Sequence, residues 1–434
     1  MLYDNLAVNE YGHLTIAGVD ALDLVKEYGA PLYVLDEDRI RKNARLYTES
    51  ITKLFPPGSS ALYAGKALCF RGIYPIIESE GMCADVVSPG EIYTAISAGF
   101  PAEKLFFHGN NKTDADIAYA LDSGVGCFIV DNVNELIELD RQAGERGIRQ
   151  DILLRVSVGI DPHTFDAVKT GKVDSQFGTP IETGQAEGIV KMALSCENVA
   201  LNGFHSHIGS QIFESDPFCD QVDILLAFAC DMRDKYGFTA SVFNLGGGFG
   251  VRYVASDPVV NIPSNIAEIA DHLNRGCEKT GFPVPRIYME PGRSIIADAG
   301  VTLYETGGIK VVDGYRNYIT VNGGMTDNPR FALYRSSYTV LNASRMAPDA
   351  DEELFVCTVA GRCCESGDRI AEDIIITKPS RGDIIAVLTT GAYNYSMSSN
   401  YNKLPRPALV IVSGGESRLA VKRETFEDLV AREL

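Results

Sequence analysis

Short apolar runs alternate with helix-like segments between residues 61 and 289. There are eight β-rich runs: Ala61–Tyr63, Cys83–Val87, Leu105–His108, Cys127–Val130, Ile152–Val156, Leu201–His205, Ser241–Leu245 and Arg286–Met289. Amphipathic segments such as Pro89–Gly99, Val133–Gly147 and Asn265–Gly281 separate them. Strands that alternate with helices predict βαβ units and a parallel sheet. Eight such units favour a closed (β/α)8 barrel, and an open doubly wound sheet is the alternative.

The pattern changes from about Val301 onward. Short alternating runs separated by turn residues take over, at Ile309–Val312, Tyr318–Val321, Glu353–Val359, Asp373–Ile376, Asp383–Val387 and Ala408–Val412. Such runs are typical of a mostly antiparallel domain, either a β-sandwich or a β-barrel. We therefore expect a barrel domain over residues 32–292, and a β domain built from residues 1–31 and 293–434.

Composition narrows the classes of partner. The chain has 434 residues, a formal net charge of −19 and 45% hydrophobic residues, as a globular enzyme of two domains would. Nucleic acid and anionic membranes require a basic face, so we expect neither as a partner. The ten cysteines form no C-x-x-C pair and are expected to be free thiols. The first residues lack a signal-peptide pattern and no apolar run approaches ~20 residues, so a cytoplasmic protein is expected.

Residues that can carry chemistry follow the predicted strands one after another. Lys66 follows the first strand, Asp85 and Ser88 lie at or just after the end of the second, and His108-Gly109-Asn110-Asn111 comes at the end of the third. Arg155 lies late in the fifth strand. The last three strands end in His205-Ser206-His207-Ile208-Gly209-Ser210, in Gly246-Gly247-Gly248-Phe249-Gly250, and in Glu290-Pro291-Gly292-Arg293. Functional groups of a (β/α)8 barrel come from this end of the strands, so we expect the site there.

The glycine run after the seventh strand is the first candidate for ligand binding. It is not a dinucleotide fingerprint, because Val251 stands where the third glycine should fall. Glycines at this point of a barrel can present bare backbone N–H groups to a phosphate, and Ser210 and Arg293 could complete such a site. A flexible turn is the alternative interpretation.

The histidines and Glu290 offer further chemistry. His205 and His207 point the same way on a strand, which suggests a metal, but the sequence offers no obvious third ligand and we expect no metal site. His207 could instead stack on a cofactor ring. Glu290, opposite a lysine from the first strand, could pair with a pyridinium nitrogen and keep it protonated. Lys66 itself is either a solvated surface charge or the amine that forms a Schiff base with a carbonyl cofactor.

Five motifs in this order resemble those of the fold-type III pyridoxal-phosphate-dependent decarboxylases. They are Tyr63-Ala64-Gly65-Lys66-Ala67, His207-Ile208-Gly209-Ser210-Gln211, Gly246-Gly247-Gly248-Phe249-Gly250, Glu290-Pro291-Gly292-Arg293 and Cys364-Glu365-Ser366-Gly367-Asp368. The likeness covers nearly the whole chain and is greatest to the branch of the family that acts on diaminopimelate.

The resemblance implies a role for each matching residue. Lys66 would hold pyridoxal 5'-phosphate, His207 would stack on its ring and Glu290 would pair with its nitrogen. Ser210, Gly248 and Arg293 would surround the phosphate, and the remaining cofactor-binding residues would be Asp85, Arg155, Gly247, Gly292 and Tyr393. The family forms homodimers with shared active sites, so Cys364 and Glu365 would enter from the partner subunit. Cys364 would be the acid that returns a proton to Cα.

The resemblance also implies a substrate. Arg330 and Tyr334 match the family's clamp for a distal carboxylate, with Arg293 and Tyr393 nearby, and Glu365 would bind the distal ammonium. Arginine's planar fork suits a carboxylate. The expected reaction is decarboxylation of meso-2,6-diaminopimelate to L-lysine and carbon dioxide, the last step of lysine biosynthesis.

Three positions depart from the family pattern and bear on the choice of substrate. They are Leu68, Arg362 and Gln176, where the family more often has Asn, Pro and Lys. The alternatives are therefore a decarboxylase of carboxynorspermidine, arginine or ornithine type, or a catalytically silent homologue that binds a protein partner.

Overall fold

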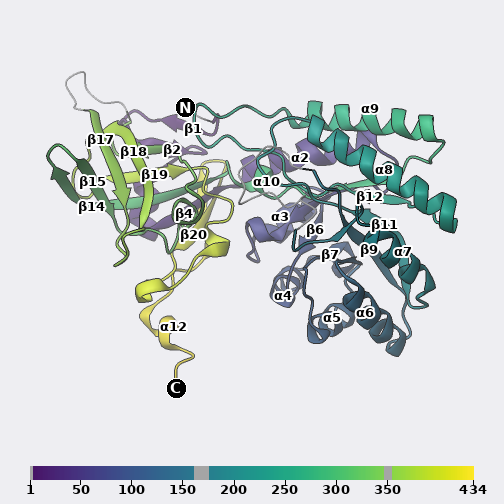
Figure 1. Ribbon diagram of the computed structural model, residues 1–434. Coiled ribbons are helices and arrows are strands. Elements are labelled where there is room, and N and C mark those ends of the chain that lie inside the picture. The colour runs from purple at the N-terminus through teal and green to yellow at the C-terminus, as the bar shows by residue number, and fades with distance from the viewer. Residues whose placement is uncertain (1–2, 161–174, 347–353) are drawn as a thin grey trace. The chain divides into compact units, whose positions relative to one another are not determined.

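The computed structural model describes residues 3–160, 175–346 and 354–434, which divide into two compact units. Unit 1 comprises Met1–Lys42, Val251–Pro258 and Ile295–Leu434, and unit 2 comprises Asn43–Gly250 and Val259–Ser294. Figure 1 traces the chain through both. Within the described residues, no helix is both long and apolar enough to cross a membrane.

Unit 2 is built on a closed barrel of eight parallel strands. In chain order these are β5 (Ser60–Ala64), β6 (Cys83–Val86), β7 (Leu105–Phe107), β8 (Cys127–Val130), β9 (Gln150–Ser157), β11 (Val199–His205), β12 (Val242–Asn244) and β13 (Arg286–Met289). Each strand pairs in parallel with the next, and β13 pairs with β5 to close the ring. A short strand, β10 (Thr179–Pro180), adds to β9. The predicted barrel is therefore confirmed, and the open sheet is excluded.

Helices alternate with the barrel strands. They are α2 (Glu37–Leu54), α3 (Ile73–Ser79), α4 (Pro89–Ser97), α5 (Asp114–Asp122), α6 (Val133–Glu145), α7 (Gln185–Ser195), α8 (Asp216–Tyr236), α9 (Ile262–Thr280) and the single turn α10 (Arg293–Ile296), with 3-10 turns η1 (Gly65–Ala67) and η2 (Ala102–Lys104). Of these, α4, α5, α6 and α9 begin at side-chain caps. Ser88, Thr113 and Asn132 accept a hydrogen bond from the third residue of α4, α5 and α6. Such caps satisfy N–H groups that a helix leaves open, which fixes where each helix starts after its strand.

Unit 1 is a mostly antiparallel β domain. One sheet joins β1 (Leu6–Val8), β2 (Leu14–Ile16) and β3 (Val19–Asp20). The larger sheet has the order β18-β17-β15-β14-β4-β20-β21, and β19 links β14 to β16. Its strands are β4 (Leu32–Asp36), β14 (Gly300–Val312), β15 (Arg316–Val321), β16 (Val340–Asn342), β17 (Leu354–Ala360), β18 (Arg369–Thr377), β19 (Ile384–Leu388), β20 (Ala408–Ser413) and β21 (Glu416–Val421). The predicted β domain is thus confirmed, with two parallel pairs, β4–β20 and β15–β17, inside it.

Short helical elements complete unit 1. They are α1 (Ala21–Tyr28), α11 (Arg330–Tyr334), α12 (Phe426–Val430), η4 (Tyr395–Met397) and η5 (Tyr401–Lys403). Apolar residues of β2, α1, β4, β14, β19 and β20 form its core, including Ile16, Leu24, Val34, Leu303 and Val410.

The unit boundaries differ from the ranges that the pattern suggested. The apolar run Leu32–Leu35 was placed in the barrel domain, but β4 pairs with β14 and β20 of unit 1. The segment Val251–Pro258 also belongs to unit 1, although it lies within the expected barrel range. Strand pairing places Leu32–Leu35 in unit 1, and hydrogen bonds of Tyr253 with Arg330 and Thr339 link Val251–Pro258 to it. A local pattern carries neither kind of information.

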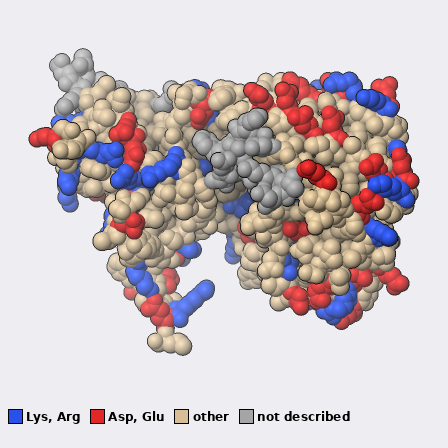
Figure 2. Space-filling model, in the orientation of Figure 1, with Lys and Arg blue, Asp and Glu red and all other residues tan. Residues whose placement is uncertain are grey.

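Charges of both signs are dispersed over the face that Figure 2 shows. The ten cysteines are free: Cys127, Cys277 and Cys357 are buried, and Cys364 is exposed.

Candidate active site

The carboxyl ends of the barrel strands of unit 2 bring the predicted residues together. Lys66 lies on η1 directly after β5, and Glu290 follows β13, the strand that pairs with β5. The Ala64 N–H donates to the Pro291 carbonyl over 3.1 Å. A Cβ at Gly292 would lie 2.8 Å from that of Ala64, so the two loops touch. Lys66 and Glu290 therefore leave neighbouring strands at the same rim.

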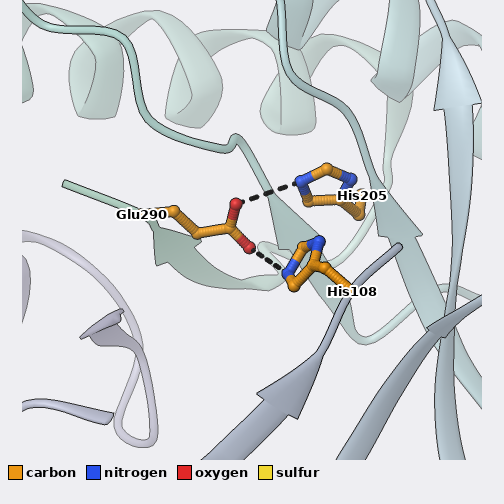
Figure 3. Close-up of side chains that lie close together, drawn as sticks. All are labelled: His108, His205 and Glu290. Carbon is orange, nitrogen blue, oxygen red and sulfur yellow. Dashed lines mark hydrogen bonds and ion pairs between the residues drawn. The ribbon is translucent and has the colours of Figure 1, made fainter. Parts of the chain in front are cut away.

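Glu290 is the centre of a buried polar cluster. Its Oε1 lies 2.8 Å from His108 Nε2, its Oε2 lies 3.2 Å from His205 Nε2, and Asn244 Nδ2 donates to Oε1 over 2.7 Å. Figure 3 shows the two imidazoles approaching the carboxylate, each toward one oxygen. His108 directly follows β7, and His205 is the last residue of β11. The rings meet edge to face, with centroids 4.9 Å apart.

The protonation states in this cluster follow from burial and neighbouring charge. Burial alone would raise the pKa of Glu290, but His108 and His205 outweigh it and hold the pKa well below its usual range. Burial lowers the pKa of His205 to about 4, against the opposing pull of Glu290. Burial, with the charges of Lys66 and Arg155, also holds the pKa of His207 well below its usual value. Near neutral pH, Glu290 is therefore ionised, while His205 and His207 are neutral.

The same atoms meet the spacing of a metal ligand set. Ligand atoms of His108, His205 and Glu290 lie within 4.8 Å of one another. The sequence suggested His205 with His207 and offered no third ligand. The structure instead groups His205 with a histidine from β7 and with Glu290, a set that only the closed barrel brings together.

Two more carboxyl groups lie close to Lys66. Asp85, at the end of β6, is buried, and burial raises its pKa while His108 and Lys66 oppose the rise. Glu91 of α4 accepts a hydrogen bond from the Val87 N–H over 2.8 Å, and burial raises its pKa to about 7. Sequence reasoning selected Asp85 but missed Glu91, which reads as an ordinary acid in the first turn of a helix.

The glycine turn after β12 is a close backbone contact rather than a flexible turn. A Cβ at Gly247 would lie 2.1 Å from the Glu290 carbonyl oxygen, and one at Gly248 would lie 2.4 Å from that of Gly209. Gly246 and Gly248 also have φ of 67° and 127°, which glycine adopts readily. Next to this turn, Arg293 Nε and Nη2 donate to Ser210 Oγ over 3.1 and 3.0 Å. The residues predicted to surround a phosphate therefore lie together.

Asn244 and Gln221 are site residues that sequence reasoning missed. The Asn244 amide donates to Glu290 and accepts from the Gly246 N–H over 3.0 Å, so one side chain joins the carboxylate to the glycine turn. Gln221 of α8 donates to the Ser206 and Leu245 carbonyls over 3.0 Å each, which ties the ends of β11 and β12 together. Both residues are fully buried, and a single amide in an apolar segment gave no signal.

Arg155 of β9 lies in a second polar group on the rim. Its Nε lies 3.9 Å from Asp131 Oδ1, and its guanidinium lies over the Phe177 ring at 4.6 Å. Asp131 Oδ1 also accepts from the Gly178 N–H over 3.0 Å. Gln176, the departure from the family pattern, is exposed beside this group.

The remaining predicted residues belong to unit 1. Arg330 is buried on α11 and donates through Nη1 to Tyr253 Oη over 2.9 Å and to Tyr338 Oη over 3.3 Å. Tyr334, on the same helix, is 43% exposed, so the two members of the expected clamp have different surroundings. Tyr393 is half-buried with φ of 62°, and Cys364 and Glu365 are exposed.

Comparison with known proteins agrees with this arrangement. Residues 37–297 match the family model described as "Pyridoxal-dependent decarboxylase, pyridoxal binding domain". The chain is 43% identical over 426 residues to a diaminopimelate decarboxylase of Bacillus subtilis (strain 168), covering 98% of this chain and 96% of the relative. A relative of the same name from Synechocystis sp. is 40% identical over 435 residues, covering 98% and 91%.

Solved structures agree as well. The crystal structure of diaminopimelate decarboxylase from M. jannaschii in complex with L-lysine superposes with a TM-score of 0.90 at 32% identity, covering 99% of this chain and 98% of that one. With matches of this extent in sequence and structure, the chain belongs to the diaminopimelate decarboxylase family of pyridoxal-dependent decarboxylases.

Proposed function

We propose that this chain decarboxylates meso-2,6-diaminopimelate to L-lysine and carbon dioxide with pyridoxal 5'-phosphate as cofactor, the last step of lysine biosynthesis. The observation that carries the proposal is the pair formed by Lys66 and Glu290 on neighbouring strand ends, with Glu290 buried and ionised. Pyridoxal phosphate has an aldehyde that an amine can bind and a ring nitrogen that a carboxylate can pair with. An amine and a carboxylate at one rim therefore match this cofactor. The relatives that are named diaminopimelate decarboxylase support diaminopimelate as the substrate.

The residues present fit the cofactor. The turn at Gly246–Gly248 packs so closely on backbone that side chains are excluded, and Ser210 and Arg293 lie beside it as donors for a phosphate. Glu290 is charged although buried, which suits a partner for a protonated ring nitrogen. Bound pyridoxal phosphate supplies the electron sink that accepts the pair left when carbon dioxide departs.

The chain's own residues have separate tasks in this proposal. Lys66 would hold the cofactor through its amine. Glu290, held in place by His108, His205 and Asn244, would keep the ring nitrogen protonated. His207 would lie against the ring as a neutral imidazole. The cofactor's other contacts come from Asp85, Arg155, Gly247, Gly248, Gly292 and Tyr393.

Substrate selection is assigned to charged groups that match the distal end of diaminopimelate. Arg330 binds the distal carboxylate with Tyr334, and Arg293 and Tyr393 assist. Two tyrosine hydroxyls share one nitrogen of Arg330, which supports a fixed orientation of its guanidinium fork. Glu365 binds the distal ammonium.

Proton return is assigned to Cys364 of the partner subunit in a cytoplasmic homodimer. Cys364 is exposed, whereas burial and Asp368 raise the pKa of the half-buried neighbour Cys363 to about 12. The contrast supports Cys364 as the thiol that meets substrate and Cys363 as a structural residue.

A substrate panel on the cofactor-loaded protein tests the proposal. Carbon dioxide release is measured with diaminopimelate, carboxynorspermidine, arginine and ornithine. We expect diaminopimelate to be preferred by kcat/KM, and Lys66→Ala to abolish both activity and the cofactor's absorption band at the visible–ultraviolet border. Preference for another amino acid would reassign the substrate. A protein that neither takes up the cofactor nor releases carbon dioxide would be a silent homologue.

A further inference from the structure

The loop between β17 and β18 of unit 1 carries two adjacent cysteines in different surroundings. Cys364 is exposed, and Cys363 is half-buried next to Asp368. An exposed thiol that must deliver a proton to one carbon atom needs a fixed position, because small displacements from the productive geometry cost a large part of the rate. The contacts that fix this loop are therefore relevant to turnover.

Asp368 fixes the side of the loop that precedes Cys364. Its Oδ2 accepts from the Cys363 N–H over 2.6 Å, and its Oδ1 accepts from the Met325 N–H over 2.7 Å. A Cβ at Gly324 or at Gly361 would lie 2.4 or 2.3 Å from this carboxylate, so backbone packs directly around it. The buried carboxylate thus joins the loop to the segment after β15. Within the loop, it accepts from the backbone of residue 363 but not from that of residue 364.

Asn402 holds the next residue. The Cys364 N–H donates to Asn402 Oδ1 over 2.7 Å, across 38 residues of sequence. Asn402 lies within η5 with φ of 53° and ψ of 24°, a left-handed conformation that asparagine adopts more readily than most residues. Both residues are exposed on the monomer, so the hydrogen bond is made in competition with water. Since water could also accept from the Cys364 N–H, we explain this hydrogen bond by the position that it gives to Cys364.

We propose that Asn402 is a positioning residue that fixes the backbone of Cys364 for proton return. This proposal rests on the proposed role of Cys364 in decarboxylation. Asn402 acts through the amide of Cys364 and not on the substrate. The side chain of Cys364 is left exposed while its backbone is held by Asn402 at residue 364 and by Asp368 at residue 363.

Two substitutions separate the acceptor from the backbone conformation. Asn402→Gly keeps a residue that adopts positive φ but removes the acceptor, whereas Asn402→Asp keeps an acceptor at the same place. We expect Asn402→Gly to lower kcat at least about tenfold with KM for diaminopimelate within about twofold, because only the proton-return geometry changes. Asn402→Asp should retain kcat within about threefold of wild type.

A second measurement reports on the loop without turnover. Hydrogen exchange of the peptide that contains Cys364, in the cofactor-loaded protein, should be faster in Asn402→Gly and close to wild type in Asn402→Asp. The melting temperature and the cofactor's absorption band should be unchanged in both. If Asn402→Gly unfolds below the assay temperature, the same comparison is made at a lower temperature at which all variants are folded.

Cys364→Ala and Cys363→Ala in the same assays show which proposal fails. Loss of turnover in Cys364→Ala alone, with normal kcat in Asn402→Gly, would overturn the role of Asn402 and leave the proton donor intact. Equal kcat in Asn402→Gly and Asn402→Asp would likewise overturn the role of Asn402 and leave the proton donor intact. Full turnover in Cys364→Ala would overturn the proton donor, and the role of Asn402 with it.

Discussion

At His205 the buried site makes the stability of the protein depend on pH. The folded pKa is about 4, below the ordinary value near 6.5, so unfolded His205 binds a proton between these values and folded His205 does not. This contribution is present above pH 6.5 and is lost as the pH falls toward 4. His205→Asn removes the titrating group. We expect wild type to lose at least about 1 kcal/mol more free energy of unfolding than the variant between pH 7.5 and pH 5.

Urea unfolding of the cofactor-free protein at the two pH values measures this difference. Phe204→Leu is the control, because Phe204 is buried on the same strand, β11, and carries no titratable group. Its acid dependence should match wild type. An identical acid dependence in His205→Asn and wild type would mean that the pKa of His205 is the same in the folded and the unfolded protein.

Arg330 is the residue on which substrate choice depends most. Arg330→Ala removes the cation proposed to bind the distal carboxylate, a charge-assisted contact of about 2–3 kcal/mol. We expect kcat/KM for diaminopimelate to fall ~30-fold or more, while ornithine, which lacks that carboxylate, is affected far less. Steady-state kinetics with both substrates measures the difference. Arg335→Ala, at an exposed arginine that ends the same helix, should change neither; equal losses with both substrates would undo the clamp.

Single residues were predictable where a motif carried chemistry. Lys66, Glu290 and the glycine turn were found from type and spacing, and the structure puts all of them on one rim. Asn244 was missed because an amide in an apolar strand has no distinctive spacing, although it touches Glu290. Tyr253 was missed for another reason: it contacts Arg330 across 77 residues, a proximity that only tertiary structure creates.

At the scale of elements, the turn after β12 has no space for a side chain. Gly247→Ala would put a Cβ 2.1 Å from the carbonyl oxygen of Glu290, and that backbone cannot move without disturbing β13. We expect a loss of about 2–3 kcal/mol of stability and weaker cofactor binding, as for overpacked sites. Urea unfolding and cofactor titration by absorbance measure the two effects.

Gly188 in the middle of α7 is the matched control. A Cβ there meets nothing within 4 Å, so Gly188→Ala should raise stability by about 0.5–1 kcal/mol through its helix propensity. If Gly247→Ala behaved like Gly188→Ala, the turn would have room to relax. The close contact would then not be required for the cofactor.

Elements were predicted well where periodicity decides and poorly where long-range pairing does. Eight apolar runs gave the barrel strands to within about two residues, which is the usual uncertainty of strand ends. The run Leu32–Leu35 was equally apolar, yet it pairs with β14 and β20 outside the barrel. Its neighbours are some 270 and 375 residues away in the chain, a separation over which no local pattern selects a partner.

At the scale of the whole molecule, the proposal requires that Lys66 and Cys364 of different subunits form each site. Two co-expressed combinations of subunits test this. Each is purified through two different tags, one on each kind of subunit, so that only mixed dimers are assayed. The first pairs Lys66→Ala with Cys364→Ala subunits. If sites are shared, one of its two sites combines an intact Lys66 with an intact Cys364, so we expect about half of wild-type activity.

The second combination pairs wild-type subunits with subunits that carry both substitutions. It contains the same number of altered residues, but with shared sites every site lacks either Lys66 or Cys364, so it should be inactive. If instead each chain built its own site, the outcomes would be reversed: the first combination would be inactive and the second would keep about half. Because the two arrangements predict opposite results from proteins of equal composition, neither misfolding nor partial loss of cofactor can imitate the expected pattern.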